Sequence, residues 1–259
     1  MAGRFYPADA AELSRVVEAA VAEARQHQPG DAPIPKALVA PHAGYIYSGP
    51  IAASAWARAV PLRGRVERVV LAGPAHWGTR GGVVTASAAA FATPLGPVRV
   101  DTDTRDRLVA AGRVKVDDRT QAHEHSLEVQ LPFLQVTLGD VAVLPLLAMS
   151  GRSADVAVAG VLDEVWGGPE TLVVVSTDLS HYRDQAAATA LDRDTAAAVV
   201  DRRPEGIRSE LACGAVVLRG LLMVAGRRGL EVELLDLRTS ADTAGPPDRV
   251  VGYGAFALT

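Results

Sequence analysis

Apolar residues along the chain recur at two spacings, one typical of buried strands and the other of amphipathic helices. Short continuous apolar runs bounded by Gly, Pro or polar residues predict strands. These runs are Lys36 to Ala40, Glu67 to Ala72, Val141 to Leu147, Thr171 to Val175, Val232 to Leu237 and Val250 to Ala257. Apolar residues three and four apart predict helices. The predicted helices are Ala8 to Gln28, Ser48 to Val60, Thr102 to Ala111, Leu127 to Leu138, Asp155 to Val165, Ala186 to Val200 and Cys213 to Arg227.

Strands and helices alternate along the chain, which predicts a single layered α/β domain over residues 1–259 with a mainly parallel central sheet flanked by helices. Local signals agree with this pattern. Asp9, with Glu12 three residues later, predicts the N-cap of the first helix. Pro132 predicts a kink or a restart in the helix that contains it.

One region departs from the alternating pattern. Its apolar runs are short and bounded by Gly and Pro, at Val83 to Ser87, Ala90 to Thr93 and Val98 to Val100. Such runs are typical of antiparallel edge strands or a hairpin. We therefore expect an antiparallel excursion beside the main sheet.

Composition and charge exclude several classes of partner. The net charge of −4 and the isoelectric point near 5.9 leave no broad basic field, so we expect no nucleic-acid partner. No apolar run approaches the roughly 20 residues of a membrane span, and the N-terminus shows no secretory signal. Cys213 is the only cysteine, so no internal disulfide forms, which suits a reducing compartment. We expect a cytoplasmic protein without a membrane partner.

Histidines follow three of the predicted strands, at His42, His76 and His181. If these strands are parallel, all three side chains lie at one edge of the sheet, where ligands of open α/β sheets bind. Asp178 belongs to the same loop as His181. An imidazole at such a position binds metal or transfers a proton near neutral pH. The pattern therefore predicts one pocket lined by several titratable groups.

The remaining candidates are less clear from the residues alone. His27 ends the first helix and is expected at the surface. His123 and His125 precede a helix, and we expect His125 to point inward, whereas a capping or solvated role stays open for His123. Cys213 stands where a loop gives way to a helix, a place that lowers a thiol pKa and favours the metal-binding thiolate. Lone cysteines are more often small core residues, which is the reading that the residues alone favour.

Several common catalytic motifs are absent from the sequence. It contains no P-loop, no dinucleotide-binding glycine motif after a strand, no nucleophile elbow and no H-E-x-x-H helix. Nucleotide binding, serine hydrolysis and a zincin site therefore lose support. A pocket of His, Cys and Asp side chains suits iron, copper or zinc, and spacing alone does not choose among them.

Taken together, the motifs resemble the Memo family, known in prokaryotes as the AmmeMemoRadiSam system protein B group. They run in order nearly from end to end of the chain. They are Arg4-Phe5-Tyr6-Pro7, Pro41 to Gly49, Gly73-Pro74-Ala75-His76, Glu124 to Phe133, Ser176 with Asp178 to Tyr182, Cys213-Gly214 and Val250-Val251-Gly252-Tyr253.

The resemblance implies a fold similar to that of the class III extradiol dioxygenases. It also implies a metal site whose ligands are His42, His76 and Cys213, which makes Cys213 an expected ligand instead of a core thiol. The positions of His125, Asp178 and His181 are expected to line the same pocket. This ligand set differs from the two histidines and one glutamate of the dioxygenases, so catechol cleavage does not follow from the fold.

Two classes of function follow from the resemblance. The first is a metal-dependent oxidoreductase, with iron(II) as the first expectation and copper or zinc as alternatives, acting on an unidentified small molecule. In it His125 or His181 moves protons, and Asp178 orients His181. The second is a non-enzymatic binding or scaffold protein, because eukaryotic members are adaptors that bind phosphorylated peptide. The prokaryotic name implies a radical-SAM partner enzyme, which would carry the radical chemistry, since this chain has no three-cysteine cluster motif.

Overall fold

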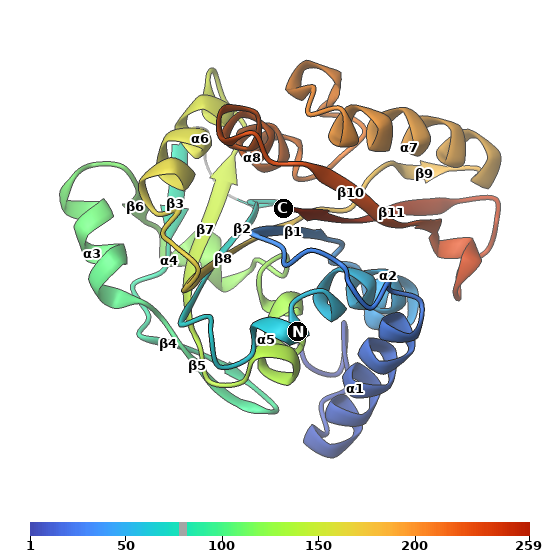
Figure 1. Ribbon diagram of the computed structural model, residues 1–259, viewed down its shortest axis with the longest axis horizontal. Coiled ribbons are helices and arrows are strands. Elements are labelled where there is room, and N and C mark those ends of the chain that lie inside the picture. The colour runs from blue at the N-terminus through green and yellow to red at the C-terminus, as the bar shows by residue number, and fades with distance from the viewer. Residues whose placement is uncertain (78–81) are drawn as a thin grey trace.

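The computed structural model describes residues 1–77 and 82–259 (Figure 1). Within this part of the chain, nine strands form one sheet in the order β10-β11-β1-β8-β2-β7-β3-β6, and β9 pairs with β11. The strands are β1 (Ala37–Ala40), β2 (Arg68–Pro74), β3 (Gly82–Thr85), β6 (Lys115–Val116), β7 (Ala142–Met149), β8 (Thr171–Ser176), β9 (His181–Arg183), β10 (Val232–Thr239) and β11 (Val250–Leu258). Strands β4 (Ala90–Thr93) and β5 (Gly96–Arg99) form a separate antiparallel hairpin, as expected for this region.

The centre of the sheet is parallel and its outer parts are mostly antiparallel. Strand β8 pairs in parallel with β1 on one side and β2 on the other, and β2 pairs in parallel with β7. Beyond this centre, β11 is antiparallel to β1, and β3 is antiparallel to β7. The predicted α/β class is confirmed, with a mixed sheet whose parallel strands lie together at the centre.

Helices cover both faces of the sheet (Figure 1). Helices α1 (Ala10–Gln26), α2 (Tyr45–Ala57) and α5 (Leu131–Leu138) lie on one face, and α6 (Ala154–Glu164), α7 (Gln185–Val200) and α8 (Ala215–Arg228) lie on the other. Successive strand side chains point to opposite faces. Leu38 and Ala40 therefore join the core under the first group, and Ala37 and Val39 join the core under the second. No helix in the described part of the chain is long and apolar enough to cross a membrane.

The shorter elements lie mainly around this frame. Helices α3 (Thr102–Ala110) and α4 (Asp118–Ala122) flank the β3 and β6 end of the sheet (Figure 1). Single 3-10 turns occur at η1 (Val60–Leu62), η2 (Glu128–Gln130), η3 (Pro204–Gly206) and η4 (Ser240–Asp242). Strands β6 and β9 and helix α4 escape the sequence prediction because they are two to five residues long.

Most predicted boundaries hold to within a few residues. The carboxylate of Asp9 accepts the N–H of Glu12 at 2.8 Å, so the predicted N-cap is confirmed. Pro132 lies in the first turn of α5, directly after η2, so the predicted restart is confirmed. Helix α2 begins at Tyr45, three residues before the predicted start, because the N–H of Tyr45 donates to the carbonyl of Phe5. Local periodicity does not report such a contact with the N-terminal segment.

The register of the central strands decides where the candidate site lies. Ala40 of β1 pairs with Ser176 of β8, and Ala72 of β2 pairs with Val175 of β8. The loops that follow these three strands therefore leave the sheet at the same edge. His42 and Asp178 each stand two residues beyond the first of these pairs, side by side.

Candidate metal centre

The residues singled out from the sequence converge on one cleft of about 590 Å³ at this edge of the sheet. All of these residues have titratable side chains, and each follows a strand or precedes a helix. Six of them line the cleft, namely His42, His76, His125, Asp178, His181 and Cys213. His27 and His123 are exposed, as C-caps of α1 and α4, and neither lines this cleft.

Three imidazoles form the centre of the cleft. One nitrogen from each of His42, His76 and His125 lies within 4.8 Å of the other two. The rings of His76 and His125 stack with centroids 4.8 Å apart, and His42 stands nearly perpendicular to both. Nitrogens bound at about 2 Å to one ion lie at most about 4 Å apart, so a metal ion would draw this group only slightly closer. The group fits a metal ion by donor type and spacing.

A buried hydrogen-bond network fixes the tautomer of His42. The Ser176 hydroxyl donates to the carbonyl of Ser126 at 2.7 Å, so it has no hydrogen left for His42. Its oxygen must therefore accept from Nδ1 of His42, at 2.9 Å. Nε2 of His42 is therefore unprotonated and faces the cleft, where the sulfur of Cys213 lies 3.3 Å from it.

The same network extends into the core under α2. The amide of Gln130 donates to Ser176 Oγ and to the carbonyl of Pro41, and its oxygen accepts from the indole N–H of Trp56 at 2.7 Å. The amide orientation is thus fixed at both ends. Burial lowers the pKa of His42 well below its usual value, and His76 and His125 lower it further. The ring is therefore neutral at pH 7, as metal binding requires.

We expect Ser176→Ala to weaken metal binding by about 10- to 100-fold, because Nδ1 of His42 loses the oxygen that fixes its tautomer. The measurement is a competition titration against a chelator of known affinity. Ser126→Ala is the matched control, since Ser126 is equally buried but its hydroxyl donates to the carbonyl of Pro74. Equal affinity in the two variants would contradict a role for Ser176 in setting the tautomer.

Glu124 holds the second imidazole. Its carboxylate accepts from Nδ1 of His76 at 2.9 Å and from the backbone N–H of His76 at 2.7 Å, which leaves Nε2 of His76 free. It also accepts from the backbone N–H groups of His125 and Ser126. Burial alone raises the pKa of Glu124, but these bonds and the charge of His76 outweigh it and lower the pKa to about 2. Conversely, burial lowers the pKa of His76, and Glu124 outweighs this effect and raises it above its usual value.

Cys213 lies beside this group but in an environment different from the expected one. Its sulfur is 3.3 Å from Nε2 of His42 and accepts the backbone N–H of Asp178 at 3.2 Å. Helix α8 begins two residues later, at Ala215. Burial and the charge of Asp178 raise the pKa of the thiol to about 12, so the expected lowering by the helix terminus is wrong for the metal-free protein. The sulfur is placed to reach an ion shared with His42, and binding would replace its proton.

Asp178 and His181 are both in the cleft, although their expected partnership is wrong. The carboxylate of Asp178 accepts the backbone N–H of His42 at 2.7 Å and so ties the loops after β1 and β8 together. Nδ1 of His181 bonds to the carbonyl of Leu179 at 2.7 Å, so this carbonyl orients the ring. Burial raises the pKa of Asp178, and the N–H of His42 and the nearby imidazoles oppose that effect.

Several residues that shape the site have a role that the sequence did not predict. Glu124, Ser176 and Gln130 lie within motifs of the family resemblance, but neither the motifs nor the spacing assigned them a function. Tyr253 and Tyr47 also line the cleft, whereas Trp77 is 63% exposed. A glutamate next to a predicted ligand is the one signal that could have been used, since metal-binding histidines usually donate their second N–H to a carboxylate or a carbonyl.

Comparison with known proteins gives one consistent result. The family described as Memo-like protein matches residues 1–257. The chain is 35% identical to a MEMO1 family protein of Methanopyrus kandleri, with 100% of this chain and 97% of that protein covered. It is also 35% identical to a MEMO1 family protein of Methanothermobacter thermautotrophicus, with 98% of this chain and 96% of that protein covered.

A solved structure supports the fold. The crystal structure of an uncharacterised protein of Escherichia coli K12 matches with a TM-score of 0.51 and 17% identity, over 84% of this chain and 98% of that one. This match concerns the fold alone. The sequence relatives and the family match extend over nearly the whole chain. The chain therefore belongs to the Memo-like protein family.

Proposed function

We propose that this chain is a metal-dependent oxidoreductase that acts on a small molecule in the cleft of His42, His76 and His125. The observation that carries the proposal is how the ring nitrogens are hydrogen-bonded. His42 and His76 both have Nδ1 engaged by fixed partners, which leaves Nε2 of each ring unprotonated, and the Nε2 of His42 lies 3.3 Å from the sulfur of Cys213. A group that served only to pack the core would not need three imidazoles with one nitrogen of each this close together.

Iron(II) is the metal that we propose first, with copper or zinc as the alternatives. The donors available are three imidazoles and, beside His42, the sulfur of Cys213. Imidazole suits iron, copper and zinc alike, so donor type alone leaves the choice to metal analysis. Iron bound here would supply one-electron chemistry with dioxygen. The cleft of about 590 Å³ gives a small substrate access to that position.

His181 is the proton acceptor in this proposal. Because the carbonyl of Leu179 can only accept, Nδ1 of His181 carries the hydrogen and Nε2 carries a lone pair. The side chain is partly exposed and lines the cleft, so a substrate bound in the cleft lies beside this ring. A positioned base of this kind contributes about 10²- to 10⁴-fold to rate. Asp178, held by the N–H of His42, fixes the distance between the loops that carry His42 and His181.

The test is oxygen consumption by anaerobically purified protein with a panel of catechols, after its metal content has been measured. We expect about one ion per chain and consumption that depends on both metal and substrate. His181→Ala should lower the rate at least about 100-fold with the metal content unchanged, because His181 is not in the imidazole group. His27→Ala, an exposed histidine at the end of α1, is the matched control.

Two outcomes would contradict the proposal. A folded protein purified without metal would instead favour the binding or scaffold function, in which the cleft holds a peptide or a partner such as a radical-SAM enzyme. A metal-loaded protein whose oxygen consumption is the same in His181→Ala would remove His181 from the chemistry.

A further inference from the structure

Tyr253 is a buried tyrosine of the histidine cleft that has no role in the proposed function. It belongs to β11, and its ring packs in the core under α1, α2 and α5. The residue is only 1% exposed, yet it contributes to the lining of the cleft. Its side chain is thus enclosed on every side except that of the cleft.

The hydroxyl group of Tyr253 has no hydrogen-bond partner among the residues that the structure describes. In this part of the chain, the side-chain atoms that are both fully enclosed and unpartnered are Nε of Arg68 and the oxygen of Gln121. The unpartnered hydroxyl of Tyr253 is not one of these enclosed atoms, so it is open to the cleft. Buried polar groups nearly always have a partner. A ligand or a water molecule in the cleft is therefore the partner of this hydroxyl.

The backbone around Tyr253 fixes its position relative to the loop that carries His181. The residue before it, Gly252, bonds to this loop through its carbonyl and through its N–H, which donates to the carbonyl of Ser180 at 2.8 Å. A Cβ at Gly252 would collide with the carboxylate of Asp192, so glycine permits this close approach. Asp192 in turn accepts the N–H and the hydroxyl of Ser180, each at 3.0 Å. The strand and the loop therefore form one fixed unit.

The hydroxyl of Tyr253 keeps its hydrogen at neutral pH and acts as a donor. Burial raises the pKa of Tyr253, and Asp178 and Tyr47 nearby raise it further. A protonated phenol offers one O–H to a ligand. His181 lines the same cleft and has an unprotonated Nε2. The cleft thus presents a hydrogen-bond donor and a proton acceptor to the same ligand.

We propose that Tyr253 is a catalytic residue that donates a hydrogen bond to a hydroxyl oxygen of the substrate while His181 accepts the proton of that hydroxyl. The O–H bond of the substrate breaks, its proton moves to Nε2 of His181, and the electron pair stays on the oxygen, which the O–H of Tyr253 stabilises. Nothing is oxidised or reduced in this step. The substrates are therefore hydroxylated small molecules such as phenols and diols. This role of Tyr253 rests on the proposed function of the cleft.

The test is anaerobic binding of 4-nitrocatechol to the zinc-loaded full chain, followed by the absorbance of the probe. Zinc does not change its oxidation state, so the probe binds without being oxidised. Tyr253→Phe should raise the Kd at least about tenfold with the zinc content unchanged, because a hydrogen bond to a charged oxygen is lost. Tyr182→Phe is the matched control, since Tyr182 follows His181 but is 64% exposed. It should bind the probe as the original chain does.

Stability separates a hydroxyl that binds substrate from one that supports the fold. Tyr253→Phe keeps the ring and removes no hydrogen bond within the described part of the chain. The metal-free variant should therefore unfold at the same urea concentration as the original chain. A clearly lower midpoint, or a variant that does not fold, would overturn the proposal, because the hydroxyl would then have a structural partner.

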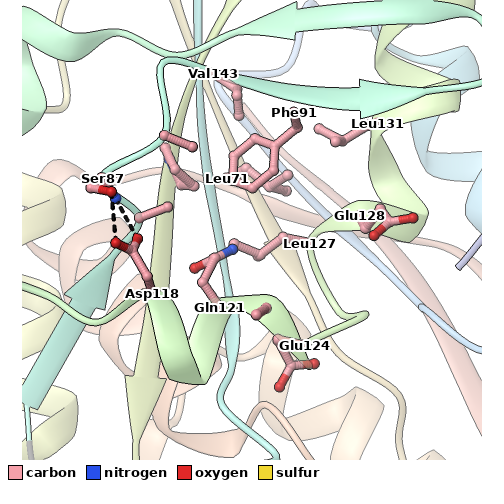
Figure 2. Close-up of a pocket in the computed structure, with 14 residues that line it drawn as sticks. Leu71, Ser87, Phe91, Asp118, Gln121, Glu124, Leu127, Glu128, Leu131 and Val143 are labelled. Atoms are coloured by element: carbon pink, nitrogen blue, oxygen red, sulfur yellow. Dashed lines mark hydrogen bonds between the residues drawn. The ribbon is translucent and has the colours of Figure 1, made fainter.

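A second pocket offers an aromatic probe another place to bind (Figure 2). It has a volume of about 350 Å³, and none of its described lining residues also lines the histidine cleft. Figure 2 shows Phe91 and Leu127 in its wall, beside α4. Ala88→Phe, at an exposed position of this wall, should leave the Kd of the probe unchanged. A loss of affinity in this variant but not in Tyr253→Phe would place the probe beside α4 and overturn the proposal.

The role of Tyr253 and the proposed function fail in different ways. A chain that binds no zinc, or that binds zinc but not the probe, would contradict both. A chain that binds zinc and the probe, with the same Kd in Tyr253→Phe, would overturn the role of Tyr253 alone.

Discussion

Replacement of His42 by alanine is expected to lower bound metal from about one ion per chain to less than about a tenth of that value. His42 is fully buried, and its Nε2 faces both the other imidazoles and the sulfur of Cys213. It therefore belongs to either ligand set, the three imidazoles or the pair of histidines with Cys213. The measurement is inductively coupled plasma mass spectrometry after anaerobic purification, with His27→Ala as control.

Two further variants separate the ligand sets. If Cys213 is the third ligand, as the family resemblance implies, Cys213→Ala loses the metal and His125→Ala keeps it. If the three imidazoles hold the ion, the pattern is reversed. Full occupancy in all three variants would refute a metal centre at this edge of the sheet.

The Glu124→Gln variant is expected to be less stable by about 2–4 kcal/mol. The carboxylate accepts four hydrogen bonds, one from the ring of His76 and three from backbone N–H groups. An amide replaces one acceptor oxygen with a donor, which must face one of these N–H groups in a buried place. The change also frees the ring of His76, so metal binding should weaken together with stability. Urea unfolding gives the change in the free energy of unfolding.

Glu128→Gln is the matched control for that variant. Glu128 is four residues along the same segment, but its carboxylate is partly exposed and bonds to Tyr6 and the N-terminal amine. Exposed pairs of this kind contribute about 0–1 kcal/mol. Equal losses in the two variants would show that the buried position of Glu124 has no special importance.

The arrangement of the site at a sheet edge could be predicted from local patterns. His42 and His76 follow apolar strands, Asp178 and His181 follow a third, and parallel pairing brings all three strand ends together. This inference needs only the period of the apolar residues and the rule that ligands bind beyond the carboxyl ends of parallel strands. The short run that forms β3 was also expected to be antiparallel, and it is, but its pairing partner β7 did not follow from such patterns, because the choice of partner depends on tertiary connections.

The supporting contacts of the site could not be predicted in this way. Gln130 meets Trp56 across 74 residues and Ser176 across 46 residues. No periodicity within a segment reports which polar residue of a distant segment lies opposite. The pKa of Cys213 shows the same limit, because the nearby helix start is local whereas burial and Asp178 are not. Local electrostatic arguments therefore gave the wrong direction for this thiol.

The separation of the candidate metal ligands along the chain has a consequence for biosynthesis. Cys213 follows His42 by 171 residues in the sequence. Strand β8, which is made late in the sequence, lies between β1 and β2 in the sheet. A ribosome must therefore complete most of the chain before His42 meets its partners. A nascent chain has no preformed centre that would capture the first metal ion it encounters. A metal ion that binds at this site would therefore be acquired after folding, and its identity would depend on which ions the folded protein encounters.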